Sequence, residues 1–243
     1  MSKHATPQLL AAATAPDWAA QLWRRYLCLW WLKTLGISLF IWIFFIAYFR
    51  LLHHPSATAW VMPLTPLDHA IAFQPGLLAV YVSLWVYVGL APGLLLRVRD
   101  LLVYGLWATL LCLIGLACFY LFPTAVPLRP LPMDLAAHPA FALLQGVDAA
   151  GNACPSLHVA MALFTMLWVR QLLGETGAPR WLAWVNAAWF SAIVYSTLAI
   201  RQHVVLDVLA GALLGLAVAW PSLHWRPAPR LPPPRDAGTV AVA

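Results

Sequence analysis

Six stretches of the chain are apolar over roughly the 20 residues that a helix needs to cross the hydrocarbon core of a bilayer. Only 9% of the 243 residues are charged, against about 25% in soluble domains, so a soluble globular fold is excluded. The stretches are Thr34–Phe49, Gly76–Leu96, Leu101–Leu121, Leu157–Leu173, Trp181–Ile200 and His203–Trp220. The sequence therefore predicts an all-α integral membrane bundle of about six transmembrane helices.

The residues outside these stretches divide the chain into three parts. Residues 1–33 form an expected cytoplasmic or interfacial segment, in which Asp17–Lys33 mixes Trp and Leu with basic residues. This pattern is typical of an interfacial amphipathic helix or of an early start to the first span. The first thirty residues lack the order of a signal peptide, so we expect them to be retained. Residues 34–220 form the membrane domain, and 221–243, rich in Pro and Arg, form an expected disordered cytoplasmic tail.

The basic residues fall unequally on the two sides that six spans would create. One side receives only Arg50, Arg129 and Arg201. The other side receives Lys3, Arg24, Arg25, Lys33, Arg97, Arg99, Arg170, Arg180, Arg226, Arg230 and Arg235. Because basic loops stay in the cytoplasm, we expect both termini there and the active site on the opposite, non-cytoplasmic face. The expected location is a bacterial inner membrane.

Two polar segments interrupt the apolar pattern, and each carries a histidine. The first is Asn152–His158, and the second is Ser196–Asp207. Ionisable residues within membrane segments are energetically costly and usually functional. In the first segment Ser156 can cap the helix that begins at Leu157, and a helix N-terminus favours a bound phosphate. His158 then lies in the first turn of that helix, where it can exchange a proton with a bound phosphoester.

The second segment has the spacing of an oriented histidine. His203 and Asp207 are four residues apart, so on a helix they share a face and the carboxylate can hold one imidazole nitrogen. The other nitrogen is then available as a nucleophile or a base. Arg129 and Arg201 are candidates to clamp phosphate oxygens, since a guanidinium binds them in a bidentate manner.

Other residues have structural interpretations. Thr65-Pro66-Leu67-Asp68 predicts a helix start that leads into the second span, with Asp68 as a cap. Gly211 and Gly215 would let the last span approach a neighbouring helix closely. The remaining candidates are better interpreted as loop, interface or packing residues: His53, His54, His69, His138, Asp148 and Cys154. The four scattered cysteines predict neither a disulfide framework nor a zinc site.

The two histidine segments resemble those of the type 2 phosphatidic acid phosphatase superfamily of membrane lipid-phosphate enzymes. That family has a basic segment ending in Arg-Pro, then Pro-Ser-Gly-His, and then Ser-Arg followed after five residues by His and four later by Asp. Here the matching residues are Arg129-Pro130, Pro155-Ser156-Leu157-His158, and Ser196, His203 and Asp207. Asn152 and Tyr195-Ser196-Thr197-Leu198 look closer to the branch that contains fungal inositol phosphorylceramide synthase.

The resemblance implies a role for each matching position. His203 would be the nucleophile that forms a phosphohistidine, Asp207 would orient it, and His158 would protonate the leaving group. Ser156 and the neighbouring backbone would hold phosphate oxygens, with Asn152 beside them. Two positions depart from the family pattern: Thr197 stands where the family has arginine and Phe122 where it has lysine. We therefore expect a weaker phosphate clamp, in which Arg201 replaces at most one lost charge.

These interpretations predict a lipid-phosphate phosphatase or phosphotransferase that needs no metal and no cofactor. Its expected partners are a lipid-phosphate substrate and the bilayer, with no nucleic acid; the oligomeric state is left open. Attack by water would make the protein a phosphatase, and attack by an inositol, sphingoid or glycerol hydroxyl would make it a phosphotransferase. A non-catalytic lipid transporter on the same scaffold is the alternative of a different class.

Overall fold

The computed structural model describes residues 17–132, 139–147 and 151–226. In these residues six helical segments are long and apolar enough to cross a membrane. They are α2 (Trp30–His53), the broken segment Pro75–Gly93, α7 (Val98–Leu121), α9 (Leu157–Glu175), α10 (Arg180–Ala199) and α11 (Val205–His224). Each corresponds to one predicted span, which confirms the all-α membrane bundle.

The second span differs from the continuous helix that was predicted for Gly76–Leu96. It consists of a 3-10 turn, η1 (Pro75–Leu77), followed by three short helices, α4 (Leu78–Val82), α5 (Leu84–Tyr87) and α6 (Leu90–Gly93). The interruptions fall near Ser83, Gly89 and Pro92, which are weak helix formers. Pro92 also lacks the N–H that a helix interior needs.

A separate helix precedes the first span. This helix, α1 (Trp18–Leu27), is followed by Leu29 in a left-handed conformation, with φ of 56°, before α2 begins. The left-handed residue breaks the helix, because it reverses the local chain direction. The structure has both alternatives for Asp17–Lys33: Trp18–Leu27 form a separate helix with no buried residue, and the first span begins early, at Trp30.

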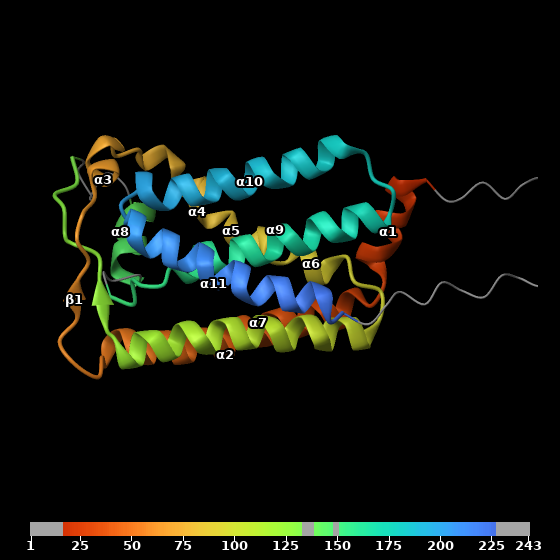
Figure 1. Cartoon of the computed structure of the whole chain (residues 1–243), viewed down its shortest axis with the longest axis horizontal. Helices are drawn as coiled ribbons and strands as arrows, with labels where there is room; N and C mark the ends of the chain where they lie inside the picture. The colour runs from red at the N-terminus through yellow and green to blue at the C-terminus, as the bar shows by residue number, and fades with distance from the viewer. Residues whose placement is uncertain (1–16, 133–138, 148–150, 227–243) are drawn as a thin grey trace, which may run out of the picture.

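The non-helical segments gather at one end of the bundle. There β1 (Trp60–Val61) pairs in parallel with β2 (Thr124–Ala125), next to the short helix α3 (Pro66–Ala70). Thr65 and Asp68 form the predicted capping box of α3, but Ile71–Gln74 separate α3 from the second span. Figure 1 shows β1, α3 and α8 (Pro139–Val147) together at this end, and α1 at the other.

The helix α9 lies at the centre of the bundle, with α10 on one side and α11 and α7 on the other (Figure 1). Its side chains Phe164, Trp168 and Leu172 are completely buried. The indole nitrogen of Trp168 donates to the hydroxyl of Ser222 on α11 at 2.9 Å, so the polar atom of this core residue is paired. The two histidine segments thus lead into α9 and α11, which pack against each other.

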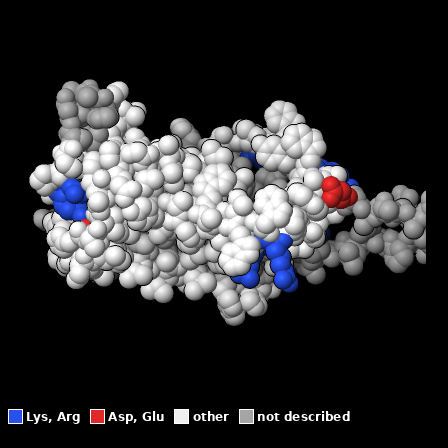
Figure 2. All heavy atoms as spheres, turned by 90° about the horizontal axis from the view of Figure 1, so that it is seen from above, with Lys and Arg blue, Asp and Glu red and all other residues white. Residues whose placement is uncertain are grey.

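Charged side chains are concentrated near the two ends of the molecule, and a belt of uncharged residues separates them (Figure 2). Near the end that carries α1, Glu175 forms ion pairs with Arg25 and Arg226. The last helix continues to His224, so residues 221–224 of the predicted disordered tail are helical. Residues 1–16 and 227–243 lie outside the described part of the chain.

Candidate active site

His203 lies in the turn between α10 and α11, and not on the last helix as the four-residue spacing suggested. The helix α11 begins at Val205. The predicted contact nevertheless forms: Nδ1 of His203 is 3.2 Å from Oδ2 of Asp207. The other carboxylate oxygen of Asp207 accepts the backbone N–H of Val204 at 3.1 Å, and Asp207 is completely buried. The carboxylate is therefore fixed, and it fixes the imidazole in turn.

His158 lies in the first turn of α9, as predicted. Ser156 is the N-cap of this helix, and its hydroxyl accepts the N–H of Val159 at 3.3 Å. The ring of His158 stacks on Tyr81 of α4 with 4.4 Å between ring centres. The ring centres of His158 and His203 are 5.7 Å apart. The two histidines, which are 45 positions apart in the sequence, thus face one small volume.

Two glycines on α11 set the distance between the helices that carry the histidines. A Cβ atom at Gly211 would lie 2.3 Å from the carbonyl oxygen of Ser156, and one at Gly215 would lie 2.6 Å from that of Ala160. The N–H of Ser156 also donates to the carbonyl of Asp207 at 3.0 Å. The predicted close approach is confirmed, and it joins the start of α9 to the start of α11.

Asp68 joins three parts of the site, a role that its interpretation as the cap of α3 missed. Its Oδ1 accepts the N–H of Val205, the first residue of α11, at 2.9 Å. Its Oδ2 accepts the N–H and the hydroxyl of Thr65 at 2.8 and 2.7 Å. Its backbone carbonyl accepts Nη1 of Arg129 at 3.1 Å. Adjacent peptide groups at the start of α11 are therefore held by two carboxylates, those of Asp68 and Asp207.

Arg129 and Arg201 approach each other from different loops. Arg201 follows α10 in a left-handed conformation, with φ of 63°, and its Nη1 donates to the carbonyl of Pro130 at 2.6 Å. Its guanidinium lies over the ring of Phe73 at 5.2 Å. Burial lowers the pKa of Arg129, the positive charge of Arg201 lowers it further, and Asp68 opposes both effects. Among the buried polar atoms described, the Nε of each arginine has no hydrogen-bond partner.

The remaining predicted phosphate-binding residue, Asn152, also has a left-handed backbone, with φ of 52°. Its side-chain amide donates to the carbonyl of Tyr48 on α2 at 3.1 Å. Strained backbone of this kind costs energy and gathers at functional sites. Nearby, burial raises the pKa of the Cys154 thiol, and Asp207 raises it further. This thiol is therefore held in its neutral form, in agreement with its interpretation as a packing residue.

The positions that depart from the family pattern do not supply the missing charges. The hydroxyl of Thr197 donates to the carbonyl of Val194 at 2.8 Å, within its own helix. Ser196 likewise donates to Ile193 at 2.7 Å. Phe122, at the position of the family lysine, is 72% exposed. The cations that the structure does place in this loop region are Arg129, which contacts the carbonyl of Asp68, and Arg201, which contacts that of Pro130.

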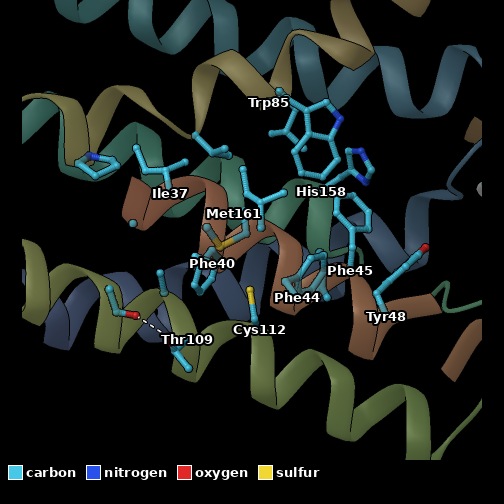
Figure 3. A pocket seen from close by; sticks show the side chains of 18 of the residues that line it. Ile37, Phe40, Phe44, Phe45, Tyr48, Trp85, Thr109, Cys112, His158 and Met161 are labelled. Atoms are coloured by element: carbon cyan, nitrogen blue, oxygen red, sulfur yellow. Dashed lines mark hydrogen bonds between the residues drawn. The ribbon is translucent and has the colours of Figure 1, made fainter. Parts of the chain in front are cut away.

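An apolar cavity of about 610 Å³ ends at the two histidines. It lies between α2, the second span and α7, and Asn152, His158 and His203 line one end. Figure 3 shows His158 and Tyr48 toward that end, Ile37 away from it, and Phe40, Phe44 and Met161 between. In the residues that the structure describes, no three His, Cys, Asp or Glu side chains form a group suited to a metal ion.

No curated protein and no solved structure matches the chain. The sequence model of the PAP2 superfamily, in contrast, matches residues 49–221. This range covers most of the chain and includes both histidine segments and the arginine loop. Members of the superfamily are generally phosphoesterases or phosphotransferases. The chain belongs to the PAP2 superfamily of membrane phosphatases and phosphotransferases.

Proposed function

We propose that this protein removes or transfers the phosphate of a membrane lipid through a phosphohistidine formed on His203. The observation that carries the proposal is the contact between His203 and Asp207 beside His158, at the end of an apolar cavity. A histidine held at Nδ1 by a carboxylate presents the lone pair of Nε2.

In the first step, Nε2 of His203 attacks phosphorus in line with the lipid oxygen. The P–N bond forms as the P–O bond to the lipid breaks, and protonated His158 gives its proton to the departing oxygen. Asp207 stabilises the positive charge that develops on His203, in the manner of a catalytic triad. The distance of 5.7 Å between the two rings suits a phosphoryl group placed between them.

In the second step, neutral His158 takes a proton from the attacking molecule as its oxygen bonds to phosphorus. The P–N bond then breaks and returns the electron pair to His203. Water as the attacking molecule yields inorganic phosphate. Because the same base serves both steps, His158 ends the cycle protonated and ready for the next lipid.

The phosphate oxygens are held by Arg129, Arg201, Ser156 and Asn152 in this proposal. Burial and, to a smaller extent, the charge of Arg201 lower the pKa of Arg129, and an anion between the two arginines relieves both effects. The N-terminus of α9 adds backbone N–H groups and a partial positive charge. Charge stabilisation then comes from protein groups, and we propose that no metal is required.

The proposal has two versions, which differ in the molecule that accepts the phosphoryl group from His203. Water gives hydrolysis, and the resemblance around Asn152 and Tyr195 keeps transfer to an inositol-type hydroxyl as the second version. We further propose that both termini are cytoplasmic and that the site faces the other side of a bacterial inner membrane, as the basic residues indicate.

The test is to incubate the purified protein with a panel of lipid phosphates and diphosphates, with and without inositol, and to analyse products by mass spectrometry. We expect metal-free release of phosphate or transfer to inositol, no turnover by His203→Ala, and a loss of at least about 10³-fold for Asp207→Asn. Turnover by His203→Ala, or inhibition of the wild type by a chelator, would refute the mechanism. Uptake of intact lipid into vesicles without cleavage would instead identify a transporter.

A further inference from the structure

The end of the apolar cavity that lies far from the histidines is held together by hydrogen bonds between helices. Lys33 of α2, Pro92 of α6 and Val98 of α7 line the cavity there, and Gly36 and Gly105 line it about one and two helical turns further in. The ammonium of Lys33 donates to the carbonyl of Gly93 at 2.7 Å and to that of Arg25 at 2.6 Å. These bonds tie α2 to α6 and to α1, so the walls of the cavity are joined at this end.

The dimensions of the cavity fit one long hydrocarbon chain. A dry apolar cavity of about 150 Å³ holds one benzene molecule, and this cavity measures about 610 Å³. Along α2 it extends from Leu32 to Phe49, which corresponds to about 25 Å of helix. One leaflet of a bilayer core is about 15 Å thick. A chain as long as that of an ordinary membrane lipid therefore fits with its phosphate at the histidines.

Between its two polar ends the cavity is lined mainly by apolar side chains. Phe40, Phe44 and Met161 contribute apolar surface in its middle (Figure 3). The hydroxyl of Thr109, which also lines it, donates to the carbonyl of Gly105 at 2.7 Å and is satisfied within α7. A chain that enters the cavity therefore leaves this hydroxyl with its own hydrogen bond.

Two glycines at the far end leave space that larger residues would fill. A Cβ atom at Gly36 or at Gly105 would meet no atom within 4 Å. The contrast with Gly211, where a Cβ atom would overlap the backbone of Ser156, shows that helix packing does not require glycine at these two positions. We propose that Gly36 and Gly105 set the longest chain that the cavity accepts, so that the far end selects substrates by chain length. This inference rests on the proposed lipid-phosphate activity.

The test compares octyl, dodecyl and hexadecyl phosphate as substrates of the wild type and of Gly36→Phe, in mixed micelles of constant lipid fraction. The added ring occupies the far end, so kcat/KM for hexadecyl phosphate falls about tenfold, equivalent to about 1.4 kcal/mol. That for octyl phosphate is unchanged, because a short chain ends before Gly36. Gly105→Leu tests the same space from the opposite wall and gives the same selective loss.

The matched control is Leu35→Phe, at the neighbouring position, which is 61% exposed. It places a ring at the same depth outside the cavity and leaves the ratio of hexadecyl to octyl activity unchanged. An unchanged ratio in both glycine variants, or an equal loss in Leu35→Phe, overturns the inference while leaving the proposed function intact. Failure of the wild type to cleave any of the three substrates counts against the proposed function instead.

Discussion

The close approach of α9 and α11 at Gly211 gives a direct test of how the site is assembled. The substitution Gly211→Ala places a Cβ atom 2.3 Å from the carbonyl oxygen of Ser156, whereas real Cβ contacts are not shorter than 3.0 Å. The start of α9 must therefore move from α11 by at least 0.7 Å. This movement lengthens the bond from the N–H of Ser156 to Asp207 and separates His158 from His203.

A misplacement of about 1 Å reduces catalysis by about 100-fold, and we expect a kcat loss of that order for Gly211→Ala. The assay is the initial rate of phosphate release by purified protein, with the melting temperature measured on the same samples. Alanine raises intrinsic helix stability by about 0.5–1 kcal/mol relative to glycine, which offsets part of the overlap. We therefore expect kcat to fall about 100-fold while the melting temperature changes little.

The control is Gly174→Ala on α9, where a Cβ atom would meet nothing within 4 Å. It keeps wild-type activity. Gly215→Ala, with a Cβ atom 2.6 Å from the carbonyl of Ala160, gives an intermediate loss because the overlap is smaller and lies one turn further from the site. Activity of Gly211→Ala within threefold of the wild type, or an equal loss in Gly174→Ala, would refute the reasoning.

Three further predictions concern the loops of the site and the orientation of the chain. Asp68→Asn turns an N–H group toward one of the donors that the carboxylate accepts, so the start of α11 at Val205 shifts and kcat falls about tenfold with little change in KM. Arg201→Gln removes one cation from the proposed clamp, so KM for a lipid phosphate rises about tenfold. Because salt screens the attraction between Arg201 and the phosphate, high salt raises KM of the wild type and makes this difference smaller. In intact cells, a membrane-impermeant thiol reagent labels Thr58→Cys but not Gly174→Cys, each in a chain whose native cysteines are replaced.

Each of these predictions has its own control. Asp100→Asn alters another buried carboxylate in the first turn of a helix, at the start of α7, and is expected to lower stability without a selective loss of kcat. Arg180→Gln removes a cation from the start of α10 and leaves KM unchanged. Unchanged kcat in Asp68→Asn, unchanged KM in Arg201→Gln, or the reverse labelling pattern would contradict the respective argument.

The sequence predicted those features that depend on neighbouring residues. Ser156 caps α9 and Thr65 caps α3, because a cap is made within one turn of the chain. The predicted pairing of His203 with Asp207 is correct although α11 begins at Val205 and not at His203. A four-residue spacing brings the two side chains together in this turn as well as in a helix. The six spans followed from the length of each apolar stretch.

Features that depend on distant residues could not be predicted in this way. Asp68 and Val205 are 137 residues apart, and no local pattern indicates that they meet. Arg201 leaves α10 in a left-handed conformation, and its side chain reaches the carbonyl of Pro130, 71 residues earlier in the chain. Such a conformation is set by tertiary contacts, because isolated arginine disfavours it.

The hydrogen bond between Asp68 and Val205 also has a consequence for the synthesis and membrane insertion of the protein. His203, the proposed nucleophile, follows five of the six spans in the chain, so the ribosome makes it nearly last. In the proposed mechanism His203 needs both Asp207 and His158, and these come together only once α11 has packed against Asp68 and the start of α9. We therefore expect a partly synthesised chain to be unable to attack the lipids that surround it until membrane insertion is complete.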